Sequence, residues 1–102
     1  MNAKTHVAYL VTWTEYERGW GCRPDGASLH LTQKNAKEYI SAYWKTMPKE
    51  APYEYSREDS ATGRLVAITP KLYNQLKKAR NHSIVLWQTE YTKLCESGDI
   101  KK

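Results

Sequence analysis

Residues 6–13 have the sequence His-Val-Ala-Tyr-Leu-Val-Thr-Trp, and this stretch decides the fold. Its β-branched and aromatic side chains are typical of a strand, and apolar residues fall on both alternating faces. A strand that is apolar on both sides has to be covered on both sides. We therefore expect residues 6–13 to form the central strand of a sheet.

A second, shorter strand is predicted at residues 28–31, Ser-Leu-His-Leu, where polar and apolar side chains alternate. Residues 15–26 separate the two strands and contain three glycines and a proline. Within them, Arg23-Pro-Asp-Gly26 has proline and glycine at the positions that a type I turn favours. The two strands are therefore expected to pair as a hairpin with a long loop.

Two amphipathic helices are predicted further along the chain. Thr32 is a good N-cap, and residues 33–47 carry apolar side chains at helical spacing before Pro48 ends the pattern, namely Ala36, Tyr39, Ile40, Tyr43, Trp44 and Met47. Thr69-Pro70 marks the start of the second helix. The inner face of that helix is expected to be formed by Leu72, Tyr73, Leu76 and Ala79, with Asn81 as its C-terminal cap.

The remaining segments complete the predicted element order. Residues 48–63 are expected as a loop with a brief extended piece around 53–57, residues 64–68 as a strand, and residues 82–91 as a last strand centred on Ile84–Trp87. The order strand, strand, helix, strand, helix, strand predicts an α+β fold. We expect one small, mostly antiparallel sheet with two helices packed on one face. Residues 1–95 form a single domain in this prediction, and residues 96–102 form a flexible tail.

The composition limits the classes of protein to which the chain can belong. It has 102 residues with a formal net charge of +5, eight Tyr, four Trp and no Phe. No apolar run is long enough for a membrane span or a signal peptide, so we expect a cytoplasmic protein with free thiols at Cys22 and Cys95 and no membrane partner. Acidic residues are interspersed among the basic ones, which does not indicate a basic arm for nucleic acid.

The most unusual segment is Tyr16–Gly26, in which two glycines flank Trp20. Its arginines and its glycine-rich backbone are suited to an anion, through forked donors and exposed amides. A structural loop explains the same pattern without any ligand. On the functional interpretation, the contact surface for a ligand or partner comprises Arg18, Trp20, Arg23, Asp25, His30, Tyr53, Tyr55 and Arg57.

Other kinds of site are less favoured. The outer face of the second helix is suited to nucleic-acid phosphates through Lys71, Lys77, Lys78 and Arg80, although such a face also keeps a helix soluble. Ser28 and His30, with Asp25 nearby, suggest a small hydrolase, but they lack an obvious orienting arrangement. The His and Cys spacings do not match zinc sites. We therefore expect no catalytic residues, no metal and no cofactor.

One resemblance covers residues 9–59. The run Tyr-Leu-Val-Thr-Trp-Thr-Glu-Tyr-Glu-Arg-Gly-Trp-Gly-Cys-Arg-Pro-Asp-Gly-Ala-Ser-Leu-His-Leu-Thr, a helix with Tyr-Trp, and Tyr-Glu-Tyr-Ser-Arg resemble small bacteriophage-encoded accessory proteins. The resemblance implies a non-enzymatic binding protein in the cytoplasm of the bacterial host. Such a protein antagonises a host defence by binding a host protein or a small anionic, nucleotide-like ligand. Homo-oligomerisation through a tyrosine-rich face is a further expectation.

Overall fold

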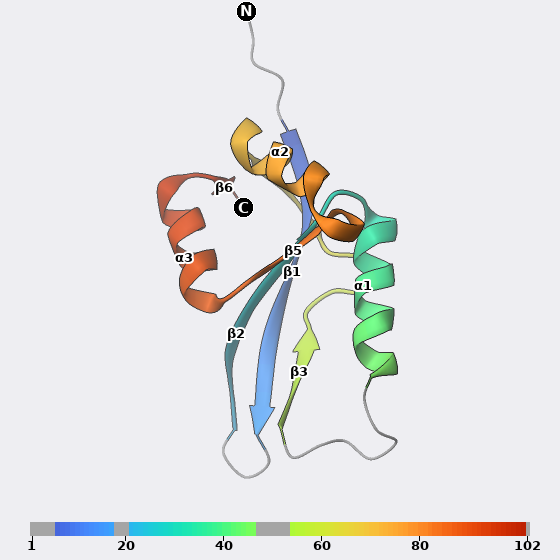
Figure 1. Cartoon of the computed structure of the whole chain (residues 1–102). Helices are drawn as coiled ribbons and strands as arrows, with labels where there is room; N and C mark the ends of the chain where they lie inside the picture. Colours follow the sequence, from blue (N-terminus) through green and yellow to red (C-terminus); the bar gives the residue numbers. More distant parts are fainter. Residues whose placement is uncertain (1–5, 18–20, 47–53, 102) are drawn as a thin grey trace, which may run out of the picture.

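The computed structural model describes residues 6–17, 21–46 and 54–101 of the chain (Figure 1). It has the predicted α+β class, with a curled antiparallel sheet and three α-helices. The elements in chain order are β1 (His6–Glu17), β2 (Gly21–His30), α1 (Gln33–Lys45), β3 (Glu54–Glu58), β4 (Arg64–Ile68), α2 (Pro70–Lys78), the 3₁₀ turn η1 (Arg80–His82), β5 (Ser83–Leu86), α3 (Gln88–Ser97) and β6 (Ile100–Lys101).

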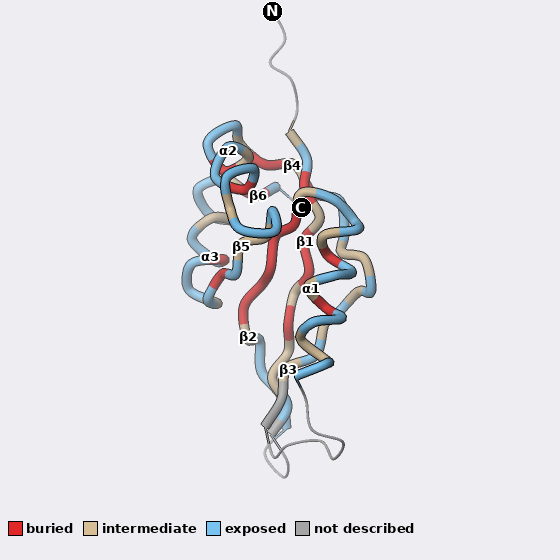
Figure 2. Tube along the Cα trace, turned by 45° about the vertical axis from the view of Figure 1, so that its right-hand side comes forward, coloured by how far each residue is buried: buried red, intermediate tan, exposed pale blue. Residues whose placement is uncertain are grey.

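The strand β1 is central, as its sequence predicts. The strand order is β5-β2-β1-β4-β6, and β3 pairs with the far half of β1 on the same side as β4. All pairings are antiparallel, with Leu10 opposite Leu29 in β2 and Ala8 opposite Val66 in β4. The central part of β1 and the second half of β2, residues 26–30, are buried, as the tube in Figure 2 shows.

The expected loop over residues 15–26 is wrong for most of its length. The hairpin of β1 and β2 continues past Trp13, so that Glu15 pairs with Arg23 and Tyr16 pairs with Cys22. The register shifts between Thr12 and Thr14, where β2 contains an extra residue, which makes this a β-bulge. Gly26 lies at the bulge with φ +100°, so the glycine that suggested a tight turn instead allows β2 to bend.

The two helices predicted on one face lie on opposite faces of the sheet, as Figure 1 shows for α1 and α3 and the core contacts show for α2. Ala8 and Leu10 of β1 pack with Leu72 and Leu76 of α2 and with Tyr91 of α3. The alternate residues Val11 and Trp13 pack on the other side, with Ala36 and Ile40 of α1. This division satisfies the two apolar faces of β1, which one layer of helices cannot cover.

Two helix starts are confirmed in detail. Thr32 caps α1 by accepting a hydrogen bond from the Asn35 amide at 3.1 Å, and Thr69 caps α2 by accepting one from Leu72 at 3.4 Å. The predicted cap at Asn81 is wrong, because α2 ends earlier with Ala79 as its C-cap. Asn81 instead has φ 55° within η1.

A third helix, α3, replaces most of the strand predicted at residues 82–91. β5 ends at Leu86, and the Glu90 carboxylate accepts a hydrogen bond from the Trp87 amide at 3.1 Å, which helps to start α3. The expected tail at residues 96–102 also needs correction over its described part. Ser97 closes α3, and Ile100 is buried in the core where β6 pairs with β4.

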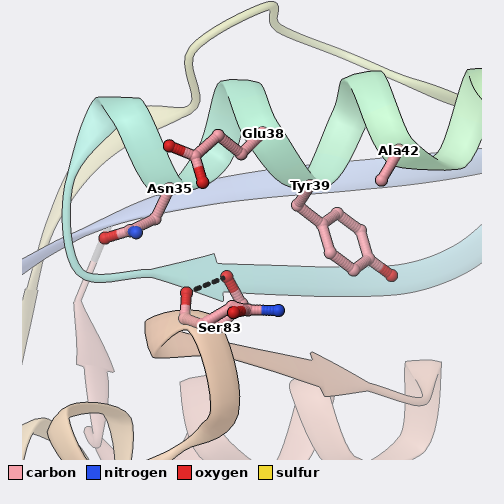
Figure 3. Close-up of a pocket in the computed structure, with 6 residues that line it drawn as sticks. Asn35, Glu38, Tyr39, Ala42 and Ser83 are labelled. Carbon is pink, nitrogen blue, oxygen red and sulfur yellow. Dashed lines mark hydrogen bonds between the residues drawn. The ribbon is translucent and has the colours of Figure 1, made fainter.

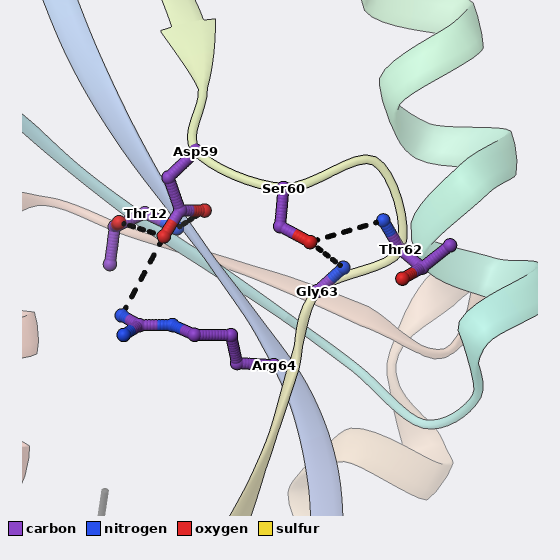
Figure 4. Close-up of polar contacts among 6 residues, drawn as sticks. All are labelled: Thr12, Asp59, Ser60, Thr62, Gly63 and Arg64. Carbon is purple, nitrogen blue, oxygen red and sulfur yellow. Dashed lines mark hydrogen bonds and ion pairs between the residues drawn. The ribbon is translucent and has the colours of Figure 1, made fainter.

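Asp59 joins β3 and β4 along one edge of β1 (Figure 4). Its amide donates to the Thr12 carbonyl at 2.9 Å, and its carboxylate accepts from the Thr12 amide at 3.0 Å and the Thr12 hydroxyl at 2.7 Å. The side chain of Asp59 therefore satisfies a β1 amide at the point where the chain leaves the edge of the sheet. Ser60 closes the following turn by accepting hydrogen bonds from the amides of Thr62 and Gly63.

We expect Asp59→Ala to lower the free energy of unfolding by about 2 kcal/mol, because it removes two hydrogen bonds to a charged acceptor. The matched variant is Arg64→Ala. The Arg64 guanidinium lies 3.6 Å from the Asp59 carboxylate and is largely exposed, so its loss should cost less than about 1 kcal/mol. Urea unfolding of both variants measures the two values, and equal losses would contradict the bridging role of Asp59.

Candidate functional site

Several of the predicted contact residues lie outside the described residues. These are Arg18, Trp20 and Tyr53, and for Tyr55 only the backbone is described, opposite Tyr16. Arg23, Asp25, His30 and Arg57 are described. The structure separates these four residues rather than gathering them around one ligand position.

The two described arginines of the predicted surface do not converge. Arg23 pairs in register with Glu15, and Arg57 pairs with Thr14. Since neighbouring residues of β1 point to opposite faces, the side chains of Arg23 and Arg57 lie on opposite faces of the sheet. The Arg23 side chain is 69% exposed and lies 3.3 Å from the carboxylate of Glu15, which is 16% exposed. Arg23 and Arg57 therefore cannot clamp one small anion together.

His30 is fully buried, in contrast to its predicted place on the contact surface. It belongs to a chain of hydrogen bonds beneath α1. The Trp13 indole donates to the Ser28 hydroxyl at 2.9 Å, Ser28 lies 2.8 Å from His30 Nε2, and His30 Nδ1 lies 2.7 Å from the Ser83 hydroxyl. This chain ties β1, β2 and β5 together on the face that α1 covers.

The donor and acceptor roles in this series of hydrogen bonds follow from its last residue, Ser83. Ser83 donates to the Asn81 carbonyl at 3.2 Å, so its oxygen accepts from His30 Nδ1–H. His30 Nε2 then accepts from the Ser28 hydroxyl. With a neutral imidazole, both ring nitrogens of His30 therefore have a hydrogen-bond partner. Burial lowers the pKa of His30 from 6.5 to about 4.

The Ser28–His30 contact has the geometry of a nucleophile and its base, which the strand spacing did not indicate. Both residues are fully buried, and Ser28 also accepts from Trp13. A substrate therefore cannot reach the Ser28 oxygen without displacing Trp13 or α1. The arrangement explains the polar core of this face better than it supports hydrolysis.

Two pockets that share Tyr39 as a lining residue lie between α1 and β5, and we call the two together the α1–β5 groove. Its upper part, the polar pocket, has a volume of about 260 Å³ and lies between the first turns of α1 and the η1–β5 junction (Figure 3). The Tyr39 ring extends from α1 across this space, and Ser83 faces the helix from the other side. The polar pocket is lined by Asn35, Glu38, Tyr39, Ala42, Asn81 and Ser83.

Tyr39 also lines the lower part of the groove, the aromatic pocket, which has a volume of about 110 Å³. The ring centroids of Trp13 and Tyr43 are 4.9 Å apart at 60°, and those of Trp13 and Tyr39 are 5.9 Å apart at 77°. The lining consists of Trp13, Asp25, Ala27, Tyr39, Tyr43, Ser56, Val85 and Leu86.

Asp25 and Tyr43 are held at the aromatic pocket by Ser56. The Ser56 hydroxyl donates to the Asp25 carboxylate, and the Ser56 amide donates to the Tyr43 hydroxyl at 2.8 Å. Burial raises the pKa of Tyr43, the amide hydrogen bond lowers it, and the charges of Asp25 and Glu58 raise it. The surroundings of Tyr43 are therefore negatively charged.

Two apolar side chains at and just after the end of β5 are exposed. Val85 is 62% exposed and Trp87 is 74% exposed. Val85 lines the pocket from β5, and Trp87 follows two residues later in extended backbone. The sequence predicts Trp87 in the centre of a long strand, which is wrong, because β5 ends at Leu86 and Trp87 is exposed. The helical spacing of the apolar residues Tyr91, Leu94 and Cys95 is the signal for the helix that follows β5.

The basic residues predicted for nucleic acid are exposed. Lys71, Lys77 and Lys78 lie on α2 and Arg80 follows it. Lys77 is placed over the Tyr73 ring at 5.8 Å from its centroid, which is a cation–π distance. This face points away from the α1 side of the sheet, because Leu72 and Leu76 pack against the opposite core.

Among the described residues, no group of three or more His, Cys, Asp or Glu side chains is placed to hold a metal ion. None of the helices in the described ranges is long and apolar enough to cross a membrane.

Comparison with known proteins returned no match to a protein-family model, to a curated protein or to a solved structure.

Proposed function

We propose that this chain is a non-enzymatic binding module that binds another protein through the β5 edge and the α1–β5 groove. The observation that carries the proposal is the exposure of Val85, which lines the aromatic pocket, and of Trp87, two residues further along the chain. Tryptophan is the residue type most enriched among side chains that dominate binding energy, especially when it flanks a pocket. A large indole left in water is costly for a protein that has no partner to cover it.

The position of β5 supports the same surface. β5 is the last strand on its side of the described sheet and pairs only with β2 within it. Its outer edge presents backbone donors and acceptors to which an extended segment of a partner can add. Val85 and Trp87 would then supply side-chain contacts next to these main-chain hydrogen bonds.

Charge favours a protein over a small anion as the partner at this groove. The described lining of both pockets includes the carboxylates Glu38 and Asp25 and contains no lysine or arginine. A nucleotide-like ligand would place its phosphates next to these carboxylates. The resemblance to bacteriophage accessory proteins makes a host protein the first partner class to test, and a second copy of the chain is the alternative occupant.

The proposal predicts that the pair of substitutions Val85→Thr and Trp87→Ser strongly weakens partner binding without loss of folding. We expect affinity to fall by about 30-fold or more, as for a hot-spot tryptophan. The free energy of unfolding should change by less than about 0.5 kcal/mol, since both side chains are exposed.

Native mass spectrometry of the chain, isolated from the cells that produce it, measures the retained partner and the copy number together. The matched control is Lys78→Ala, an exposed change on the opposite side of the sheet, which should keep the partner. Equal partner retention by the double variant and the native chain would refute the proposal.

A second candidate function is nucleic-acid binding by α2. The exposed cations Lys71, Lys77 and Lys78 lie on a helix that contains no acidic residue, and Arg80 extends the set. If this face binds phosphates, affinity for single-stranded nucleic acid should fall steeply with added salt. Replacing Lys71, Lys77 and Lys78 with alanine should flatten that salt dependence.

A further inference from the structure

The aromatic pocket combines aromatic rings with a carboxylate, and a surface that binds another protein does not need this combination. Its volume of about 110 Å³ is well below the roughly 300 Å³ at which pockets for drug-sized ligands begin. It is therefore suited to one functional group rather than to a whole cofactor or nucleotide. The identity of that group follows from the rings and charges around it.

Three aromatic rings, together with Ala27, Val85 and Leu86, form the apolar part of the pocket. Trp13 stands at steep angles to Tyr39 and Tyr43, 77° and 60°, so the three rings meet as walls rather than as a stack. The Trp13 indole N–H is already engaged with Ser28, so Trp13 contributes its ring to the pocket. Aromatic faces within about 6 Å attract a cation through the ring quadrupole.

The charged part of the pocket is the Asp25 carboxylate. It is half-buried, and it accepts a hydrogen bond from the hydroxyl of Ser56, a β3 residue that pairs with Glu15 of β1. Glu58 lies near enough to Tyr43 to add a second negative charge to its surroundings. Among the described lining residues, the pocket contains no positive charge, in a chain with a net charge of +5. Rings together with one oriented carboxylate are complementary to a cation.

We propose that the aromatic pocket receives the guanidinium group of an arginine side chain on the partner. The proposal rests on the proposed function, since it names the group that the partner presents to the α1–β5 groove. Guanidinium is planar, is weakly hydrated, stacks on aromatic rings and donates two parallel hydrogen bonds to a carboxylate. Lysine matches the charge of the pocket but not its flat, ring-lined walls.

The test uses N-acetyl-arginine amide as a probe and does not depend on knowing the partner. The reporter is the Trp13 indole N–H resonance in ¹⁵N-correlated NMR spectra, identified with Trp13→Phe. We expect a saturable shift of this resonance in the millimolar range. N-acetyl-citrulline amide, which has nearly the same shape without the charge, should bind at least about tenfold more weakly.

Asp25→Asn keeps an acceptor for the Ser56 hydroxyl and removes only the charge, so we expect about a tenfold weaker response to the arginine probe. Glu96→Gln is the matched control, because it removes one exposed negative charge outside the pocket and should leave the affinity unchanged. The comparison of arginine with citrulline on the native chain remains decisive even if Asp25→Asn folds poorly.

The proposal is overturned if citrulline and arginine probes give equal shifts, or if neither gives a saturable shift. A response to adenosine monophosphate in place of arginine would also overturn it and would identify an anion site. If the Val85 and Trp87 double variant loses the partner but the arginine probe does not bind, the proposed binding surface is supported and only the arginine pocket is refuted.

Discussion

Replacing Gly26 with alanine is expected to lower the free energy of unfolding by about 3 kcal/mol or more. Gly26 has φ +100°, which side chains of L-residues rarely adopt. A Cβ built at this position would lie 2.3 Å from the Leu86 carbonyl oxygen and 3.3 Å from the Gln88 amide nitrogen. Both neighbours are backbone atoms at the β5–α3 junction, so neither can move without shifting the strand or the helix.

Gly21→Ala is the matched control for this prediction. Gly21 has φ +88°, and a Cβ at this position meets nothing described within 4 Å. Its substitution should therefore cost only the backbone strain, about 1–2 kcal/mol. Thermal or urea unfolding of the two variants separates the strain from the steric clash, and equal losses would contradict the close approach of β5 to Gly26.

Acid is expected to destabilise the folded chain through His30. The pKa of His30 is about 4 in the folded chain because of burial, and about 6.5 when it is solvated. Between these values the unfolded chain binds a proton that the folded chain excludes, so stability falls as the pH is lowered through this window. The difference corresponds to a loss of about 3 kcal/mol between pH 6.5 and pH 4.

The hydrogen bonds of His30 explain why its protonation is unfavourable in the folded chain. A protonated His30 has two donors, but the Ser28 hydroxyl already donates to Nε2 in the neutral arrangement and would have to turn away. The charge would also lie between Tyr39, whose ring centroid is 5.2 Å away, and the two serines, with no carboxylate among the described hydrogen-bond partners of the ring.

Urea unfolding at a series of pH values tests this prediction. His30→Gln should be less stable than the native chain at pH 7 and should lose the component of acid sensitivity that appears between pH 6.5 and pH 4. His82→Asn changes an exposed histidine with φ 50°, a conformation that asparagine tolerates, and should keep that component. If His30→Gln and the native chain have parallel profiles over this range, the buried neutral histidine is not the cause.

At the candidate site, local sequence patterns predict the helix and the strands but not how their side chains are arranged around the groove. Tyr39 and Tyr43 belong to the apolar stripe that the sequence predicts for α1, and both pack against Trp13. Their half-exposed positions along a groove depend on β5 leaving space beside the helix, which no helical spacing encodes. In the same way, the sequence predicts that Arg23 and Arg57 share one contact surface, but strand pairing places them on opposite faces of the sheet.

Several elements could be determined from the sequence by itself. Apolar residues on both faces of residues 6–13 required a central strand, and Thr32 and Thr69-Pro70 marked the starts of α1 and α2. These features depend on interactions among residues within one or two turns or along one strand. The tertiary structure alone decided which face each helix covers, because that choice depends on contacts between distant segments. It also decided that Gly26 forms a bulge against Leu86, that His30 is sealed between Ser28 and Ser83, and that Trp87 remains in solvent.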